Sequence, residues 1–450
     1  MNYSLTEGSL KKALLFFAIP LFFSQLFQTL YNTVDTVIIG YYLGDASLAA
    51  VGAVASLFEL IVGFCTGFGQ GLGVIAAQKY GAGEMKTFRW SIGLSIVLAF
   101  CLSASVSVIM TQCMSSVLHF MKTPADIFDQ SCSYITVIAM GLVITMFFNL
   151  CAGMLRAVGD SKTPLVILFI SSMLNVFLDI YFLADLHMGV EGTAWATLIA
   201  QAVSLLICLL WIFFKRKELV PTPHDFAWNS SLVKSLSEMG FSMALMSSIV
   251  SVGTLILQTG INPLGTLIIT GHTAARKLVS ILNLPVSSLM MALSSFVAQN
   301  TGAGRLARVE KGIAFANRLG VYYSIILTVV IIFASRFLIT AISGTENPVV
   351  ENTGSLYLLT NIPFFPVLAL LLNLRTSLQS MSMKLVPVLS SVIELLGKLL
   401  FTWFIVPFTG YYGICATEPA VWTAMMLFLA FFYLRNPLFV KNKIKAHLLR

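Results

Sequence analysis

Twelve long apolar runs, separated by short polar turns, constrain this chain more than any other feature of its sequence. Each run is about 20 residues or longer, which is the length that an α-helix needs to cross a hydrocarbon layer of roughly 30 Å. Because backbone groups in lipid must be hydrogen-bonded internally, such runs predict spanning helices. We therefore expect an all-α integral membrane protein with spans over residues 13–39, 48–77, 90–118, 132–155, 164–185, 192–214, 235–258, 266–296, 313–334, 355–381, 386–408 and 413–434.

Basic residues gather at the turns on one side of these spans. If the spans alternate in direction, 20 of the 27 Lys and Arg residues fall on one side, and two, Lys122 and Arg336, fall on the other. The positive-inside rule then places both termini in the cytoplasm of a protein of the cell membrane. Topology therefore explains the formal net charge of +8, and no nucleic-acid partner is expected.

Several classes of function are disfavoured by what the sequence contains. The seven cysteines show no C-x-x-C spacing, so neither a disulfide nor a structural metal site is expected. Five histidines are spread along the chain without a nucleophile or metal-ligand pattern, so we expect no enzyme and no cofactor. A phosphate loop of the Walker type is also absent from the sequence, which disfavours ATP as the energy source. The first run is too long for a cleavable signal peptide and is interpreted as a span.

The two halves of the chain repeat each other at an offset near 220 residues. Residues 77–83 (AQKYGAG) align with residues 298–304 (AQNTGAG), and each segment follows the second span of its half. Six spans is an even number, so both copies have the same orientation and form parallel repeats. The glycines are explained by tight turns. We expect an N-terminal six-helix lobe over 1–216, a linker over 217–233, a C-terminal six-helix lobe over 234–434 and a basic tail over 435–450.

Asp179 lies within a predicted span, where an ionised carboxylate costs roughly 2.5–3.5 kcal/mol and therefore indicates a pathway, a relay or a binding site. Asn175 precedes it by one helical turn and shares its helix face. Counting residues from the nearest turns places Asp179, Thr197 and Asp35 at one depth, about 13 Å below the turn. Equal depth permits these side chains to meet. A purely structural pair of buried acids is the alternative.

Four segments together resemble the multidrug and toxic compound extrusion (MATE) transporters. They are the Pro20–Gly44 run with Asp35, the AAQKYGAG turn, the Asn175-x-x-x-Asp179 helix and the AWATLIAQ stretch from Ala194. The resemblance covers essentially the whole chain. It implies a V-shaped pair of helical bundles and cation-driven export of organic, often cationic, compounds. In the branch of the family that couples through its N-terminal lobe, the cation site matches Asp35, Asn175, Asp179 and Thr197.

The coupling ion is left open by these residues. The two carboxyls can carry a proton, and the same four side chains offer the hard oxygen ligands that Na⁺ prefers. Another branch of the family couples through an acid in the seventh span. The run from Gly240 to Gln258 contains no acid, which disfavours a sodium site in the C-terminal lobe.

In the second repeat, Glu394 and Lys398 occupy the positions of Asn175 and Asp179. An acid four residues before a base can form an ion pair on one helix face, and a gate that responds to substrate is the other interpretation. Glu418, just before a proline in the last span, is a candidate for lining the substrate cavity.

The leading hypothesis is thus a secondary antiporter that exports amphipathic, cationic organic compounds in exchange for H⁺ or Na⁺. The alternative is a flippase for a lipid-linked oligosaccharide or another large amphiphile. Such cargo carries pyrophosphate and would favour a basic lobe interior, whereas the first lobe carries Asp35 and Asp179. We expect a monomer whose partners are the lipid bilayer and its small organic substrates.

Overall fold

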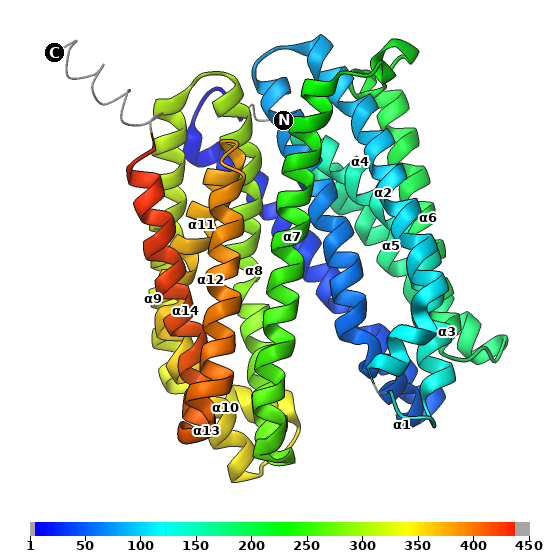
Figure 1. The fold of residues 1–450 in the computed structure, drawn as a ribbon, viewed down its shortest axis with the longest axis vertical. Helices are drawn as coiled ribbons and strands as arrows, with labels where there is room; N and C mark the ends of the chain where they lie inside the picture. Colours follow the sequence, from blue (N-terminus) through cyan, green and yellow to red (C-terminus); the bar gives the residue numbers. More distant parts are fainter. Residues whose placement is uncertain (1–4, 122, 437–450) are drawn as a thin grey trace. The chain divides into compact units, whose positions relative to one another are not determined.

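The computed structural model describes residues 5–121 and 123–436, and these residues form helices joined by short turns, with no strand in either range (Figure 1). Lys122 and the basic tail beyond residue 436 lie outside the described residues. The apolar runs form helices because every backbone donor and acceptor can then be paired within its own segment. The all-helical class predicted from the sequence is therefore confirmed.

The first half of the chain contains six predicted spans and a linker. Its helices are α1 (Leu10–Gly81), α2 (Met85–Phe120), α3 (Phe128–Met140), α4 (Leu142–Ala157), α5 (Lys162–Ile180) with the π-helical turn η1 (Tyr181–Asp185), and α6 (Val190–Lys215). The linker holds the short 3₁₀ turns η2 (Lys217–Leu219) and η3 (Pro223–Phe226).

The second half repeats the order of the membrane spans, with additional short turns. Its helices are α7 (Ser230–Ile261) with the 3₁₀ turn η4 (Asn262–Leu264), α8 (Thr266–Gly302), α9 (Leu306–Ser343), α10 (Pro348–Asn361), the 3₁₀ turn η5 (Ile362–Phe364), α11 (Phe365–Ser380), α12 (Leu385–Leu400) with the π-helical turn η6 (Phe401–Ile405), α13 (Val406–Thr409) and α14 (Tyr411–Leu434).

Twelve spans can be counted among the described residues. Ten helical segments are long and apolar enough to cross a membrane, and the bent pair α3 and α4, which meet at an angle of 47°, makes one more. The 72-residue α1 is two helices, because Gly44 between them has non-helical backbone angles (φ 78°, ψ −174°). The count therefore agrees with the sequence prediction.

Backbone irregularities recur at matching places in the two halves. Gly44, between the first two spans, corresponds to Gly265 between α7 and α8, and both have positive φ. Gly83 and Gly304, in the two aligned AQKYGAG and AQNTGAG segments, also have positive φ (73° and 68°). Only glycine adopts this conformation without steric cost, which is the physical reason for the repeated G-A-G pattern.

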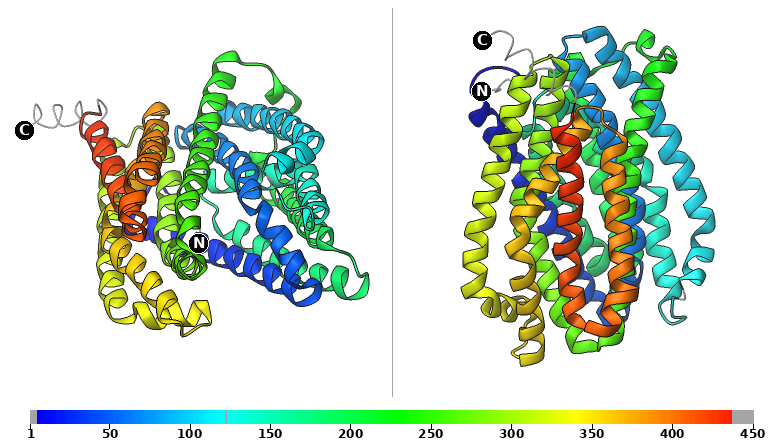
Figure 2. Two further views of the ribbon diagram at one scale, coloured as in Figure 1. Left: turned by 60° about the horizontal axis from the view of Figure 1, so that its bottom comes forward. Right: turned by 60° about the vertical axis from the view of Figure 1, so that its left-hand side comes forward.

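The described residues form two compact units that are not simply the two sequence halves. Unit 1 comprises Phe23–Ser248, and unit 2 comprises the described residues of Tyr3–Phe22 and Ile249–Arg450. The beginning of α1 thus belongs to unit 2, and the beginning of α7 belongs to unit 1. In unit 2, helices α8, α9, α11, α12 and α14 pack side by side, as Figure 2 shows. Each repeat therefore contributes the start of its first helix to the other unit.

Glycines bring α1 and α7 close together within unit 1. A Cβ atom added at Gly71 would lie 2.6 Å from the carbonyl oxygen of Met239 and 2.7 Å from the Cα of Gly240. One turn earlier, a Cβ atom at Gly67 would lie 2.8 Å from the carbonyl oxygen of Met243. Small residues four apart allow two helix backbones to approach in this way, so this packing requires glycine at both positions of α1.

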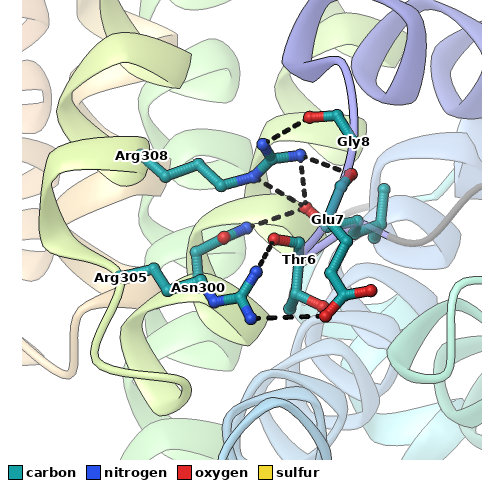
Figure 3. Close-up of polar contacts among 7 residues, drawn as sticks. Thr6, Glu7, Gly8, Asn300, Arg305 and Arg308 are labelled. Atoms are coloured by element: carbon teal, nitrogen blue, oxygen red, sulfur yellow. Dashed lines mark hydrogen bonds and ion pairs between the residues drawn. The ribbon is translucent and has the colours of Figure 1, made fainter.

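In unit 2, residues 5–8 lie across the turn between α8 and α9 (Figure 3). Arg308 donates hydrogen bonds to several backbone carbonyls of this segment, among them that of Gly8 at 2.7 Å. Asn300 donates to the Leu5 carbonyl at 3.1 Å. Arg305 donates to the Thr6 carbonyl. The guanidinium groups thereby satisfy carbonyls that precede α1 and have no helical partner.

Candidate functional site

The first candidate site lies in unit 1, where α5 and α6 pack against each other. Asn175 and Asp179 are one turn apart on α5 and are both buried, at 2% and 0% exposure. The Asn175 side-chain nitrogen lies 3.5 Å from the Thr197 hydroxyl on α6. Asp35, on α1, lies within hydrogen-bonding reach of Asp179. The structure thus brings together the three side chains that residue counting placed at one depth and Asn175, one turn away on α5.

Oxygen atoms without a donor define the chemistry of this site. Asp179 Oδ1 and Oδ2, Asp35 Oδ1 and Asn175 Oδ1 are all buried and accept no hydrogen bond from any described residue. Two ionised carboxylates can only accept, so Asp35 and Asp179 cannot satisfy each other. Burying such oxygens unpaired is costly. A proton shared between the carboxyls, or a bound hard cation, would provide the missing partner.

Two tyrosines near these carboxyls were not identified from the sequence. Tyr31, one turn before Asp35 on α1, and Tyr134, on α3, lie within electrostatic range of both Asp35 and Asp179. A tyrosine hydroxyl both donates and accepts hydrogen bonds. The four-residue spacing could have identified Tyr31, whereas Tyr134 gives no signal because only the packing of α3 brings it near.

The second candidate site is a network of buried charges in unit 2. Lys398 Nζ lies 2.9 Å from Glu394 Oε1 and 3.3 Å from Glu418 Oε1. Arg375, on α11, lies 4.0 Å from Glu394 Oε2 and also donates a hydrogen bond to Ser391. The predicted pair of Glu394 and Lys398 is therefore present. Arg375 was missed, because its sequence position does not show that it faces α12.

These four charged side chains balance one another. Arg375 and Lys398 each carry one positive charge, and Glu394 and Glu418 each carry one negative charge. All four residues are buried, with exposures between 2% and 8%. Because removing one partner from such a network leaves an uncompensated charge, the four residues must be considered together.

A π-helical turn follows the polar helix segment in both repeats. The turn η1 begins two residues after Asp179, and η6 begins three residues after Lys398. Single π-helical turns inside α-helices occur frequently at functional sites. Their recurrence beside the two polar pairs indicates that the two candidate sites occupy corresponding places in the repeats.

The comparisons with known proteins agree with this architecture. A model of the MatE family matches residues 20–181 and 242–404. The probable multidrug resistance protein YpnP of Bacillus subtilis is 26% identical over 309 residues, covering 68% of each chain. The probable multidrug resistance protein NorM of Thermotoga maritima is 26% identical over 327 residues, covering 69% of each chain.

Solved structures show the same fold. A MATE crystal structure in a bent conformation superposes with a TM-score of 0.90 at 22% identity, covering 98% of each chain. A MOP superfamily transporter from Pyrococcus furiosus superposes with a TM-score of 0.87 at 22% identity, covering 96% of this chain and 97% of the other. These likenesses confirm the predicted MATE fold with twelve helices in two lobes. Since the matched model also covers well over half of the sequence, the chain belongs to the MatE family of membrane transporters.

Proposed function

We propose that this protein is a secondary antiporter that exports amphipathic organic cations and couples their export to cation entry at Asp35, Asn175, Asp179 and Thr197. The observation that carries this proposal is the group of buried oxygens around Asp179 that accept no hydrogen bond from any described residue. The curated relatives named above as probable multidrug resistance proteins support drug export as the activity. Those names favour export over the flipping of a lipid-linked oligosaccharide.

In this proposal, the carboxyl of Asp179 alternates between two states. In one state a proton, or Na⁺, satisfies the carboxyl oxygens. In the other state the carboxyl is ionised, and the helices around it must rearrange to supply hydrogen-bond donors. A switch of this kind requires the substrate to bind the two states with different affinity. Antiport follows when substrate binds one state and is released from the other.

We propose that Glu394, Lys398 and Glu418 form the part of unit 2 that responds to substrate. Glu418 is held by Lys398 at 3.3 Å. A cationic substrate that reached Glu418 would compete with the Lys398 ammonium for the same carboxylate. Binding of the substrate would therefore change the ion pairs of the whole network, which would act as a gate.

The test is gradient-driven export of organic cations from proteoliposomes, with separate pH and Na⁺ gradients. Asp179→Asn removes the exchangeable carboxyl and retains the side-chain shape, so we expect it to abolish coupled export under the gradient that drives the unmodified protein. Asn175→Ala and Thr197→Ala each remove one neutral oxygen and should weaken coupling more mildly. Full export by folded Asp179→Asn under both gradients would refute the assignment and direct attention to Glu418.

We also propose that both termini lie in the cytoplasm and that the protein acts as a monomer in the cell membrane. The asymmetry of Lys and Arg along the chain supports the orientation. Single cysteines introduced at Lys86 and Lys217, in a variant lacking the native cysteines, should react with an impermeant maleimide only from the cytoplasmic side. Labelling of either position from outside intact cells would contradict this orientation.

A further inference from the structure

An apolar pocket opens in unit 1, and none of its lining residues belongs to the cluster around Asp179. Its volume is about 400 Å³, and its walls come from α2, α4, α6 and the start of the linker. Ile92 and Ile96 line it from α2, Leu150 from α4, Leu210 from α6 and Val220 from the linker. This volume lies within the range of about 300–1,000 Å³ that is typical of small-ligand sites. The lining is suited to hydrocarbon and offers almost no polar partner.

The walls of this pocket continue onto the outer surface of the unit. Leu210 and Phe213 both line the pocket, and 48% and 58% of their surfaces are exposed. On a membrane-spanning helix, exposed apolar side chains of this kind contact lipid chains. The pocket is therefore open to the acyl region of the bilayer.

One end of the pocket carries positive charge. Arg89 precedes Ile92 by three residues and Ile96 by seven, which places all three on one face of α2. Its Nε atom is buried and has no hydrogen-bond partner among the described residues. Lys215 and Lys217, at the end of α6 and the start of the linker, are exposed. The basic end therefore contains a guanidinium whose buried Nε–H has no acceptor among the described residues.

The acidic residues close to this end already have partners. Asp160 Oδ2 and Glu218 Oε1 lie 3.1 Å and 3.5 Å from the guanidinium of Arg216. Asp225 accepts hydrogen bonds from the backbone and hydroxyl of Thr222, both at 2.7 Å. Arg89 and the two exposed lysines form no ion pair with an acid among the described residues, so they can pair with an external anion.

The linker forms a fixed wall of the pocket. A Cβ atom added at Gly93 would lie 2.3 Å from the carbonyl oxygen of Asp225, so the linker backbone packs directly on α2. The reciprocal hydrogen bonds of Thr222 and Asp225 hold this part of the linker in one conformation. The pocket is thus built by tertiary packing.

We propose that the pocket binds one acyl chain of an anionic phospholipid whose phosphate pairs with Arg89. Apolar lining, access from the acyl region and a basic end are the features that recognise such a lipid. The bound lipid joins α2, α4 and α6 to the linker. This inference requires that the helices span a bilayer, and it is independent of the coupling ion and of the exported substrate.

The test measures lipid binding to purified, delipidated protein in neutral detergent. Phosphatidylglycerol and phosphatidylcholine with identical acyl chains are titrated separately, bound lipid is counted by native mass spectrometry, and the melting temperature is recorded. We expect phosphatidylglycerol to bind more tightly and to raise the melting temperature further. Arg89→Gln should lower the affinity for phosphatidylglycerol by about fivefold, because one basic side chain contributes roughly 1 kcal/mol to such binding. Arg89→Lys should retain most of the preference.

Two further variants separate this site from general charge effects. Leu210→Trp narrows the pocket at a half-exposed position and should reduce binding of both lipids without altering charge. Lys311→Gln, at an exposed position of α9 in unit 2, makes the same charge change as Arg89→Gln elsewhere and should leave binding unchanged. Equal affinity for the two lipids would overturn the proposal. The proposal would also be overturned if folded Leu210→Trp and folded Arg89→Gln both bound phosphatidylglycerol as tightly as the unmodified protein. A loss of affinity in Lys311→Gln equal to that in Arg89→Gln would overturn it as well.

Discussion

Replacing Lys398 by methionine should destabilise unit 2 more than replacing an exposed residue of that unit by an uncharged one. The Lys398 side chain is 3% exposed. Its ammonium forms ion pairs with two carboxylates, Glu394 at 2.9 Å and Glu418 at 3.3 Å. Without it, the ion pairs of the described residues leave those two buried acids with one cation, Arg375, which is 4.0 Å from Glu394. Removing one partner of a buried ion pair typically costs about 3–5 kcal/mol. We expect a loss in this range for Lys398→Met.

A matched double variant tests the reasoning. Lys398→Met combined with Glu418→Gln removes one charge of each sign and leaves the Arg375–Glu394 pair intact. Since apolar or neutral replacement of a whole buried pair is often nearly neutral, the double variant should recover most of the lost stability.

The assay is thermal unfolding of purified protein in detergent, with export measured in parallel. The single variant should melt clearly below the unmodified protein, and the double variant should melt between the two or close to the unmodified protein. A double variant that melts no higher than Lys398→Met would refute the charge-balance argument. A double variant that is stable but inactive would support the proposed role of Glu418 in contacting substrate.

The remaining predictions concern glycine packing and pH. Gly71→Ala should lower the melting temperature, because the new Cβ would lie 2.6 Å from a backbone oxygen. Gly52→Ala, on the same helix with no atom within 4 Å of the new Cβ, should not lower it. Equal effects of the two variants would contradict the packing argument. The hydrogen bond from Lys79 at 3.0 Å holds the pKa of the Glu84 carboxyl below its ordinary value of 4.5, so this pair contributes stability above that pH and loses it as the pH falls through the lower folded-state pKa. Because the pair is exposed, Glu84→Gln should cost less than about 1 kcal/mol at neutral pH and nothing in acid, and a stability difference that persists in acid would contradict the assignment.

Most of the fold could be predicted from the sequence because apolar runs of this length form spanning helices in lipid. The number of spans, the parallel repeat and the glycine turns all follow from run length, an offset of the sequence against itself and the conformational freedom of glycine. The broken helix at Gly141, between α3 and α4, gave no comparable signal. A break of this kind depends on packing around it, where Leu198 occupies the space that a Cβ atom at Gly141 would need.

The sequence predicted those contacts of the candidate sites that follow from depth in the membrane and from helix periodicity. Helix periodicity placed Glu394 beside Lys398, and the structure contains this contact. Periodicity and depth together placed Asn175 and Thr197 in the group around Asp179, and the structure contains the Asn175–Thr197 contact. Periodicity and depth carry no information about which face of a third helix points at the site. The contribution of Arg375 therefore required the three-dimensional packing of α11 against α12. The functional roles of all these residues stay predictions until transport is measured.

The exchange of helix segments between the two repeats has a consequence for how the protein is made. Residues 1–229 contain the glycines of α1 but not the segment of α7 that covers them, so unit 1 cannot close until Ser230–Ser248 has left the ribosome. Conversely, the C-terminal repeat translated alone lacks the segment of residues 5–22 that belongs to unit 2. We therefore expect neither repeat to fold as an autonomous module, and a chain severed in the linker should regain its structure only when both fragments are synthesised in the same membrane.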